Sequence, residues 1–480
     1  MLNKSVYIII ILILLPNFVV SQDGKKPNII VIFCDDLGFA DLSSYGSIWN
    51  ETPEIDKMAT EGLRFTNFYA GAPVCTPSRA ALMTGCYARR VDMDLDAKNR
   101  WVLFPVAKKG INPKEITLPE VLKEEGYSTA IIGKWHLGDQ PEFLPTKHGF
   151  DYWFGLPYSN DMEVLKREDP PLPLMRNEKV VQQSNKLKVF DQTTLTKRYT
   201  EEAVQWIDSN KEKPFFLYLA HTMPHNPVAA RPEFYKKTTN PKKGFGAAVA
   251  EISWSTGEIL SYLKKENLDK NTLVIFTSDN GGNPNWGASN GILKGKKGQT
   301  SEGGIRVPCI AWWPGKIEPG TTCTTPASVI DFYSTFSSLA NIKLEDATKR
   351  DGKDISQYFF NPHLEVEPRP FFYWHVGYLE AIRYGDWKIN LMGDFSKKAK
   401  ENIAKSTYSE VSSLGQVELY DLNNDPGERF NIADAHPEIV QKLISMADKE
   451  RAALGQWNDK GPEVRTTIYK KNPKPLLKQP

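Results

Sequence analysis

The chain has 480 residues, of which 40% are hydrophobic and 25% are charged, and its formal net charge is +2. This composition is that of a globular protein with a large core, and so small a net charge excludes a strongly basic nucleic-acid-binding surface. The five cysteines are sparse and irregularly spaced, which excludes a disulfide framework and any Cys-x-x-Cys zinc site.

The N-terminus resembles an export signal. One cation, Lys4, precedes an apolar run over residues 6–15 that is short for a bilayer span and is followed by small or modest residues suited to a signal peptidase. We therefore predict a signal peptide over residues 1–21 and a secreted or periplasmic protein. An uncleaved N-terminal anchor is the alternative. No later run is long and apolar enough to span a bilayer, so no stable membrane anchor is expected.

The first predicted strand covers residues 28–34, an apolar run of the kind that is buried in a parallel sheet, and it leads to Asp35 and Asp36. The next chemically informative segment is Cys75-Thr76-Pro77-Ser78-Arg79. It places a thiol and a fixed cation at the start of a predicted helix, where backbone N–H groups attract an anion. A small buried cysteine beside a proline turn is the alternative for this thiol.

Three further strands each follow a predicted helix. The helix and strand pairs are 118–125 with 128–132, 199–207 with 214–220, and 247–264 with 273–277. The polar residues after these strands are Lys134 and His136, His221 and His225, and Asp279 and Asn280. Helices alternating with apolar strands predict an α/β fold with a large, mostly parallel sheet flanked by helices. Ligands bind beyond the carboxyl ends of such strands, so we expect these residues to converge on one crevice.

Later in the chain the pattern of predicted helices and strands changes. Short strands over 371–375, 381–384, 386–391 and 417–422 and a helix over 437–454 predict a small antiparallel sheet with one helix. We therefore expect a catalytic domain over 22–350 and a C-terminal subdomain over 351–480, with a loose tail over 469–480. Residues 170–188 are expected to form a long surface loop.

Four of the candidate residues form an all-oxygen ligand set. Asp35, Asp36, Asp279 and Asn280 lie at the ends of two predicted strands. Hard divalent cations prefer such oxygens, and calcium tolerates irregular geometry better than magnesium does. We therefore predict a Ca²⁺ site. Taken singly, the acids could be solvated, and Lys134 and His136 could be a surface pair.

Together these motifs resemble the sulfatase family, in the formylglycine-dependent arylsulfatase A type. The resemblance covers most of the mature chain. It rests on residues 34–38, 75–79 with 84–85, 133–138, 155–159, 219–225, 277–281, 297–306, 419–422 and 425–428. It implies an alkaline-phosphatase-like fold and a sulfuric ester hydrolase. It also implies a maturation enzyme that converts Cys75 to formylglycine (3-oxoalanine), whose hydrated aldehyde attacks the sulfur of a sulfate monoester.

The resemblance also implies a role for each site residue. Ca²⁺ would be bound by the four oxygen ligands above and by the modified Cys75. Arg79 and Lys134 would hold the diol and the sulfate, His221 and Lys297 would donate toward the leaving oxygen, and His136 would accept the proton that releases sulfate. The expected substrate-binding residues are Ser159, His225 and His375.

The substrate is expected to be a sulfated sugar or polysaccharide. Aromatic side chains that could flank the crevice suit a pyranose ring, although most such residues pack in cores. They are Trp153, Tyr158, Trp286, Tyr373, Trp374 and Tyr378. Two other functions stay open: a phosphonate or phosphate ester hydrolase, and a carbohydrate-binding protein without catalysis, in which loss of Cys75 or of a metal ligand would be expected. The sequence does not indicate an oligomeric state.

Overall fold

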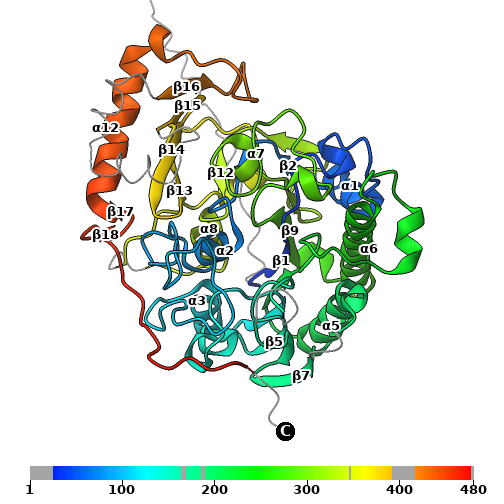
Figure 1. Cartoon of the computed structure of the whole chain (residues 1–480). Coiled ribbons are helices and arrows are strands. Elements are labelled where there is room, and N and C mark those ends of the chain that lie inside the picture. Colours follow the sequence, from blue (N-terminus) through cyan, green and yellow to red (C-terminus); the bar gives the residue numbers. More distant parts are fainter. Residues whose placement is uncertain (1–24, 164–168, 185–189, 345–347, 392–416, 477–480) are drawn as a thin grey trace, which may run out of the picture.

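The computed structural model describes residues 25–163, 169–184, 190–344, 348–391 and 417–476. The signal peptide predicted over 1–21 therefore lies outside the described residues. The main element is a ten-stranded sheet (Figure 1). In sheet order its strands are β11 (Thr321–Cys323), β2 (Leu63–Phe65), β10 (Cys309–Trp312), β9 (Thr272–Ser278), β1 (Asn28–Cys34), β8 (Phe215–Ala220), β4 (Ser128–Gly133), β5 (Tyr152–Gly155), β6 (Pro173–Arg176) and β7 (Lys179–Gln183).

The middle of this sheet is parallel. Strands β9, β1, β8, β4 and β5 run in one direction, while β10 on one side and β6 and β7 on the other are antiparallel to their neighbours. The four strands predicted to end at polar residues, β1, β4, β8 and β9, are all in the parallel part, so the predicted mixed, mostly parallel sheet is confirmed. Their carboxyl ends lie along one edge.

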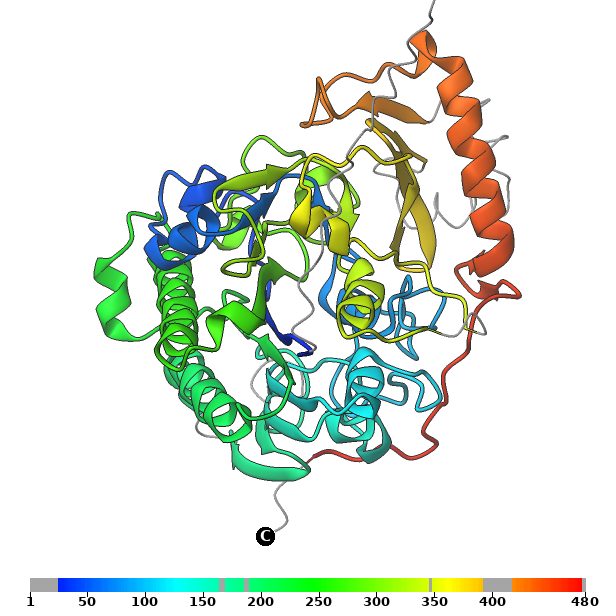
Figure 2. The same cartoon turned by 180° about the vertical axis from the view of Figure 1, so that it is seen from behind.

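Both faces of the sheet are covered by helices (Figures 1 and 2). Along β1, Ile29, Val31 and Phe33 belong to one core cluster and the alternate residues belong to another, as the two-residue period of a strand requires. The first cluster includes α2 (Cys75–Thr84), α3 (Leu118–Glu124) and α8 (Asp331–Leu339). The second includes α1 (Pro53–Thr60), α5 (Leu195–Asn210) and α6 (Lys243–Lys265).

The C-terminal region forms the predicted small antiparallel sheet. Its strands are β13 (Pro370–His375), β14 (Tyr378–Tyr384), β15 (Trp387–Asn390) and β16 (Glu418–Asp421), and α12 (Pro437–Leu454) packs against it. The remaining short elements are β3 (Phe68–Tyr69), α7 (Glu302–Ile305), β12 (Ala327–Ser328), α9 (Ser356–Phe360), β17 (Gly455–Gln456) and β18 (Asp459–Lys460).

Two expectations are not met in the described residues. Within 170–188, β6 and β7 form a hairpin that extends the main sheet, with Asn177 in the left-handed region (φ 51°) at its turn. The tail from residue 469 is not loose, because the main-chain N–H of Lys474 donates to Gln140 Oε1 (2.8 Å) and Lys470 pairs with Glu142 (2.7 Å). It runs back along the part of the molecule that contains the main sheet (Figure 1, red).

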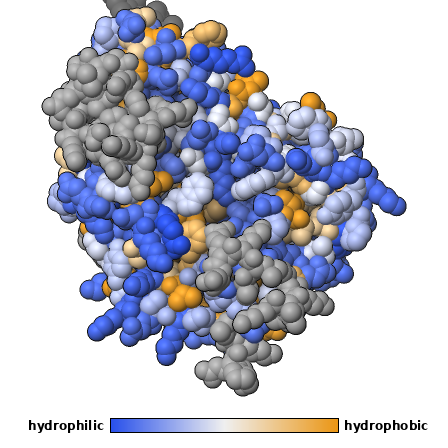
Figure 3. All heavy atoms as spheres, viewed as in Figure 1, coloured by the Kyte–Doolittle hydropathy of each residue, from blue (hydrophilic) through white to orange (hydrophobic). Residues whose placement is uncertain are grey.

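Within the described ranges, no helix is both long and apolar enough to cross a bilayer. The face shown in Figure 3 is mostly hydrophilic, with apolar residues in small scattered groups.

Candidate active site

The ends of β1 and β9 bring the predicted acids together. These strands pair in parallel register with Cys34 beside Ser278, so the residues that follow each strand are also neighbours. The main-chain N–H of Asp36 donates to Asp279 Oδ1 at 3.1 Å, and the N–H of Asp279 donates to the carbonyl of Cys34 at 3.0 Å. Both acids are fully or almost fully buried, as is Asp35.

Helix α2 presents Cys75 and Arg79 to these acids. Cys75 is the first residue of the helix, and its thiol donates to Asp35 Oδ1 at 3.4 Å. Arg79 lies four residues later, on the same face of the helix. Its guanidinium donates from Nη2 to Asp279 Oδ2 (2.9 Å) and from Nη1 to the carbonyl of Lys134 (3.1 Å). The motif therefore places a thiol and a buried cation beside two carboxylates.

Strand β4 delivers Lys134 through a glycine that the packing requires. Gly133 has a φ of +119°, and a Cβ on it would lie 1.8 Å from the carbonyl oxygen of Ala220. Lys134 Nζ then lies 2.5 Å from Asp35 Oδ2 and 3.3 Å from Ser159 Oγ. Only a glycine at position 133 allows the end of β4 to lie this close to β8. Gly133 is therefore needed to place the Lys134 side chain in the cluster.

Asp36 contacts two further residues of the cluster, Lys297 and Asn280. Its backbone adopts the left-handed conformation (φ 67°), and its carboxylate lies 2.8 Å from Lys297 Nζ. The side-chain amide of Asn280 donates to Asp36 Oδ1 at 2.8 Å. Lys297 comes from the loop after β9, so a residue that the sequence resemblance assigned to the leaving-group side reaches the cluster.

When all three carboxylates are ionised, the charges of this cluster balance before any ligand binds. Three carboxylates, Asp35, Asp36 and Asp279, face three cations, Arg79, Lys134 and Lys297. A bound divalent cation would leave the site with an excess charge of about +2, which suits an anionic substrate.

Burial and neighbouring charges shift the pKa values of two of the carboxylates in opposite directions. Burial opposes the ionisation of Asp35, but Lys134, His225 and Arg79 outweigh it and hold its pKa well below the usual range. Burial and the charge of Asp35 raise the pKa of Asp279 to about 7. Burial and Asp35 likewise raise the pKa of the Cys75 thiol, so an unmodified Cys75 is a neutral thiol and a weak nucleophile.

The donor set fits a hard divalent cation. Asp35, Asp36, Cys75 and His225 each offer one ligand atom, and these atoms lie within 4.8 Å of one another. The side-chain Oδ1 of Asn280 is buried and has no hydrogen-bond partner among the described residues. The repulsion between Asp35 and Asp279 is also what a cation would relieve. Carboxylate and amide oxygens dominate, as calcium requires.

His136 contacts the same region through its backbone and its ring. Thr76, next to Cys75, donates from Oγ1 to the carbonyl of His136 (3.0 Å). The His136 Nε2 lies 2.9 Å from the carbonyl oxygen of Leu103. Because a carbonyl only accepts, Nε2 carries the proton and Nδ1, which is buried without a partner among the described residues, is a free acceptor. Burial and Lys134 lower the pKa of His136, so the ring is neutral.

Of the two histidines after β8, the structure brings His225 and not His221 to the cluster. His225 Nε2 lies 3.7 Å from Asp36 Oδ2, and Nδ1 lies 3.5 Å from Ser159 Oγ. His221 Nε2 instead lies 3.3 Å from Ser255 Oγ on α6, and its ring packs near Tyr199 on α5. His221 therefore lies in the helical layer, contrary to its expected contact with the leaving group.

His375 does not reach the cluster either. Its Nδ1 lies 3.4 Å from Glu380 Oε1, and Glu380 accepts a hydrogen bond from Thr300, three residues after Lys297. Among the aromatic residues proposed to flank the crevice, only Trp286 is exposed. The buried ones are Trp153, Tyr158, Tyr373, Trp374 and Tyr378. Tyr218 was not among the site residues predicted from the sequence, although its hydroxyl lies 3.3 Å from the Arg79 guanidinium.

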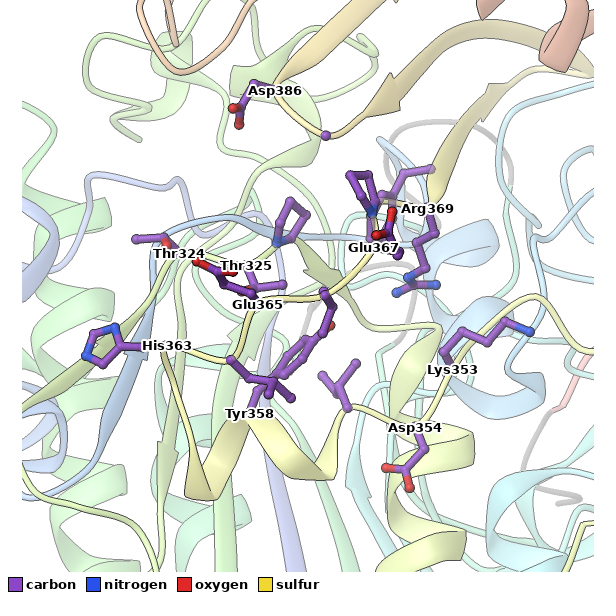
Figure 4. A pocket seen from close by; sticks show the side chains of 17 residues that line it. Thr324, Thr325, Lys353, Asp354, Tyr358, His363, Glu365, Glu367, Arg369 and Asp386 are labelled. Atoms are coloured by element: carbon purple, nitrogen blue, oxygen red, sulfur yellow. The ribbon is translucent and has the colours of Figure 1, made fainter. Parts of the chain in front are cut away.

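A separate cavity of about 520 Å³ lies beside the C-terminal sheet, lined by residues 324–326, by parts of 353–371 and by Gly385 and Asp386 (Figure 4). Its lining includes Lys353, Tyr358, His363, Glu365 and Arg369. None of the predicted site residues lines it. The convergence of charged groups at the sheet edge, rather than this cavity, therefore marks the candidate active site.

Comparisons with known proteins agree with this site. The family described as Sulfatase matches residues 27–342, and the C-terminal region of aryl-sulfatase matches residues 366–472. N-acetylgalactosamine-6-sulfatase of Canis lupus familiaris is 37% identical over 458 residues, which cover 90% of this chain and 87% of that protein. Arylsulfatase A of Homo sapiens is 36% identical over 454 residues, covering 88% and 87%.

A solved structure has a similar fold over most of the chain. The crystal structure of Ps i-CgsB in complex with k-i-k-neocarrahexaose has a TM-score of 0.75 and 30% sequence identity, and the match covers 89% of this chain and 93% of that one. The chain thus belongs to the sulfatase family and is a sulfuric ester hydrolase.

Proposed function

We propose that the protein is an exported sulfatase that removes sulfate from sulfated sugars or polysaccharides, using a formylglycine made from Cys75 and a Ca²⁺ ion. The single observation that carries this proposal is the convergence of Cys75 with three buried carboxylates and three cations, of which Arg79 and Lys134 are buried and Lys297 is partly buried. One relative is named N-acetylgalactosamine-6-sulfatase, and the similar Ps i-CgsB structure is a complex with k-i-k-neocarrahexaose; both names support a sugar.

In the mature enzyme an oxygen takes the place of the Cys75 sulfur. Hydrated formylglycine supplies one hydroxyl to attack the sulfate ester and a second hydroxyl whose deprotonation expels sulfate. Lys134 and Arg79 flank this position, with Lys134 Nζ 3.3 Å from Ser159 Oγ. We assign these three residues to holding the anionic group while charge builds on its oxygens.

Asp35, Asp36, Asp279 and Asn280 would hold the calcium ion, with residue 75 beside it. When bound there, such an ion would supply positive charge that favours an ionised hydroxyl at residue 75 and offsets the charge of the sulfate group. All four side chains are buried, and hydrogen bonds with neighbouring residues hold them in place.

We assign the leaving-group side to His225 and Lys297. His225 Nδ1 lies 2.6 Å from the carbonyl oxygen of Asn226, so that nitrogen carries a proton and Nε2 faces the cluster. When Nε2 is protonated, it and Lys297 Nζ are two proton donors on the Asp36 side of the cluster, 3.7 Å and 2.8 Å from the Asp36 carboxylate. The role that the sequence resemblance gave to His221 therefore moves to His225.

His136 is assigned to the second step. Its Nδ1 is an acceptor without a partner in the described part of the chain, and Thr76, the residue after Cys75, donates a hydrogen bond to its backbone carbonyl. A neutral imidazole in this tautomer can take the proton from the remaining hydroxyl of residue 75, which expels sulfate and restores the aldehyde.

Peptide mass spectrometry tests this proposal. Protein produced together with a maturation enzyme should contain an aldehyde in place of the thiol at residue 75, and protein produced without it should contain Cys75. Only the first sample should turn over an aryl sulfate. A fully active sample with an intact thiol would contradict the mechanism, and a higher kcat/KM on aryl phosphate than on aryl sulfate would favour a phosphate ester hydrolase.

A further inference from the structure

Two exposed tryptophans, Trp101 and Trp286, lie beside the loop that carries Lys297. Trp286 ends the short 3₁₀ helix Pro284–Trp286, between the metal-site residue Asn280 and Lys297. Its side chain is 37% exposed, yet its ring centroid lies 6.0 Å from that of His225 and 5.8 Å from Lys297 Nζ. An exposed indole therefore borders the two groups assigned to the leaving alcohol.

Trp101 approaches the same loop from another segment. It is 43% exposed, and a Cβ on Gly298 would lie 3.0 Å from its Cζ3 atom. Gly298 directly follows Lys297, and its φ of +83° also favours glycine. Two residues after Trp101, the carbonyl of Leu103 binds His136. Trp101 thus borders the side of the site that contains His136.

The backbone holds both indoles in place. The Asp96 carboxylate accepts hydrogen bonds from the main-chain N–H groups of Lys98 and Arg100, which orders the turn before Trp101. After Trp286, the Asn240 amide donates to the carbonyl of Gly287 at 3.0 Å. A large flat side chain held in water by an ordered backbone loses little conformational entropy when a ligand binds.

We propose that Trp101 and Trp286 form an aromatic platform at the mouth of the active site, which packs against the pyranose rings next to the sulfated sugar. This inference rests on the proposed function and narrows its substrate class to sulfated oligosaccharides and polysaccharides. Sugar C–H faces are apolar and match an indole face, whereas a sulfate group alone is bound by the buried cations. The platform therefore contributes to binding of the glycan and not of the sulfate.

The test compares Trp101→Ala and Trp286→Ala with wild-type enzyme on three probes. These are a carrageenan hexasaccharide, a chondroitin 6-sulfate hexasaccharide, and inorganic sulfate as a competitive inhibitor. We expect KM for the preferred hexasaccharide to rise about tenfold or more in each variant, which corresponds to one lost ring contact of ordinary strength. The Ki of inorganic sulfate should change by less than about twofold, because its buried ligands are untouched.

Phe360→Ala is the matched control. Phe360 is 38% exposed, but it packs near Trp313, whose indole donates to the carbonyl of Lys270 just before β9 begins. It therefore lies at the amino end of the strand whose carboxyl end carries Asp279. Its loss should leave KM for the hexasaccharide unchanged.

A second measurement separates binding from turnover. In the inactive Cys75→Ala protein, the Kd of the preferred hexasaccharide should weaken by a similar factor when either tryptophan is also replaced. An unchanged Kd, or a loss of kcat without a rise in KM, would overturn the platform, since it would mean that Trp286 only orients His225. If wild-type enzyme releases sulfate from a monosaccharide sulfate as efficiently as from both hexasaccharides, the platform fails while the proposed function stands. If it releases sulfate from none of these sugars, the proposed function itself fails.

Discussion

Lys388 offers the sharpest test of how the C-terminal sheet supports the active site. It lies buried on β15, with Nζ 2.9 Å from Glu302 Oε1 and 2.9 Å from Glu428 Oε1. It also donates to the carbonyl of Thr300 at 2.8 Å. Thr300 and Glu302 follow Lys297 closely in the chain, so one lysine braces the end of the catalytic loop. Lys388→Met removes the shared cation and keeps the apolar stem.

The cost follows from the burial of both carboxylates. Breaking a buried ion pair by removing one partner costs about 3–5 kcal/mol, a large part of a typical unfolding free energy of about 5–15 kcal/mol. Burial opposes the ionisation of Glu302, but Lys388 and Arg306 outweigh it and lower its pKa. A lowered folded pKa contributes stability above the unfolded pKa of about 4.3, and this is lost as the pH falls through the folded pKa. In the variant Glu302 loses its main cation, so the deficit should be largest at neutral pH and smaller near pH 4.

Urea denaturation at pH 7 and near pH 4 measures this deficit. Lys349→Met is the matched control, because Lys349 is 59% exposed and its pair with Glu463 should contribute at most about 1 kcal/mol. Adding Glu428→Gln to Lys388→Met should restore part of the stability. The bracing should also matter for catalysis, so kcat should fall in Lys388→Met. A loss of less than about 1 kcal/mol at pH 7, or one independent of pH, would refute the reasoning.

Three further outcomes are expected. His225→Ala should lower kcat by about 100-fold or more on sugar sulfates and much less on an activated aryl sulfate, while His221→Ala should show no such dependence on the leaving group; kcat on both substrates checks this. Calcium at about 100 times its Kd should raise the unfolding free energy by about 2.7 kcal/mol, and Asp279→Ala should abolish the gain in a denaturation assay. His136→Ala should give a burst of one turnover and then stall, and mass spectrometry should find residue 75 sulfated; steady turnover without trapped enzyme would oppose the role.

The apolar strands made the sheet and the site largely predictable. The predicted strands 28–34 and 273–277 are apolar except for Asn28 at the start of one and Thr277 at the end of the other. Both were therefore predicted as buried parallel strands, and the acids after them were expected to meet at one edge of the sheet. The capping box of Thr117 and Glu120 likewise fixed the start of α3. These features depend on short stretches of the chain, so they could be predicted from the sequence.

What could not be predicted depends on which face a side chain takes and on distant contacts. Leu217 and Leu219 lie in the core beneath α5 and α6, and His221 continues their alternation, so it faces the helices. The same two-residue period could have predicted that His221 faces the helices. The direction of the His225 side chain could not be predicted in this way, because the turn at Pro224 separates it from the strand. The tautomer of His136 depends on the carbonyl of Leu103, which no local pattern in the sequence connects to it.

The most direct test of the central claim is the release of sulfate from a sulfated oligosaccharide, quantified by ion chromatography, with matured wild-type and Cys75→Ala protein side by side. The arrangement of Cys75 at the start of α2, against Asp35 and beneath Lys134, predicts catalytic turnover by the wild type and none above background by Cys75→Ala. Equal sulfate release by the two proteins would contradict the assignment of residue 75 as the nucleophile.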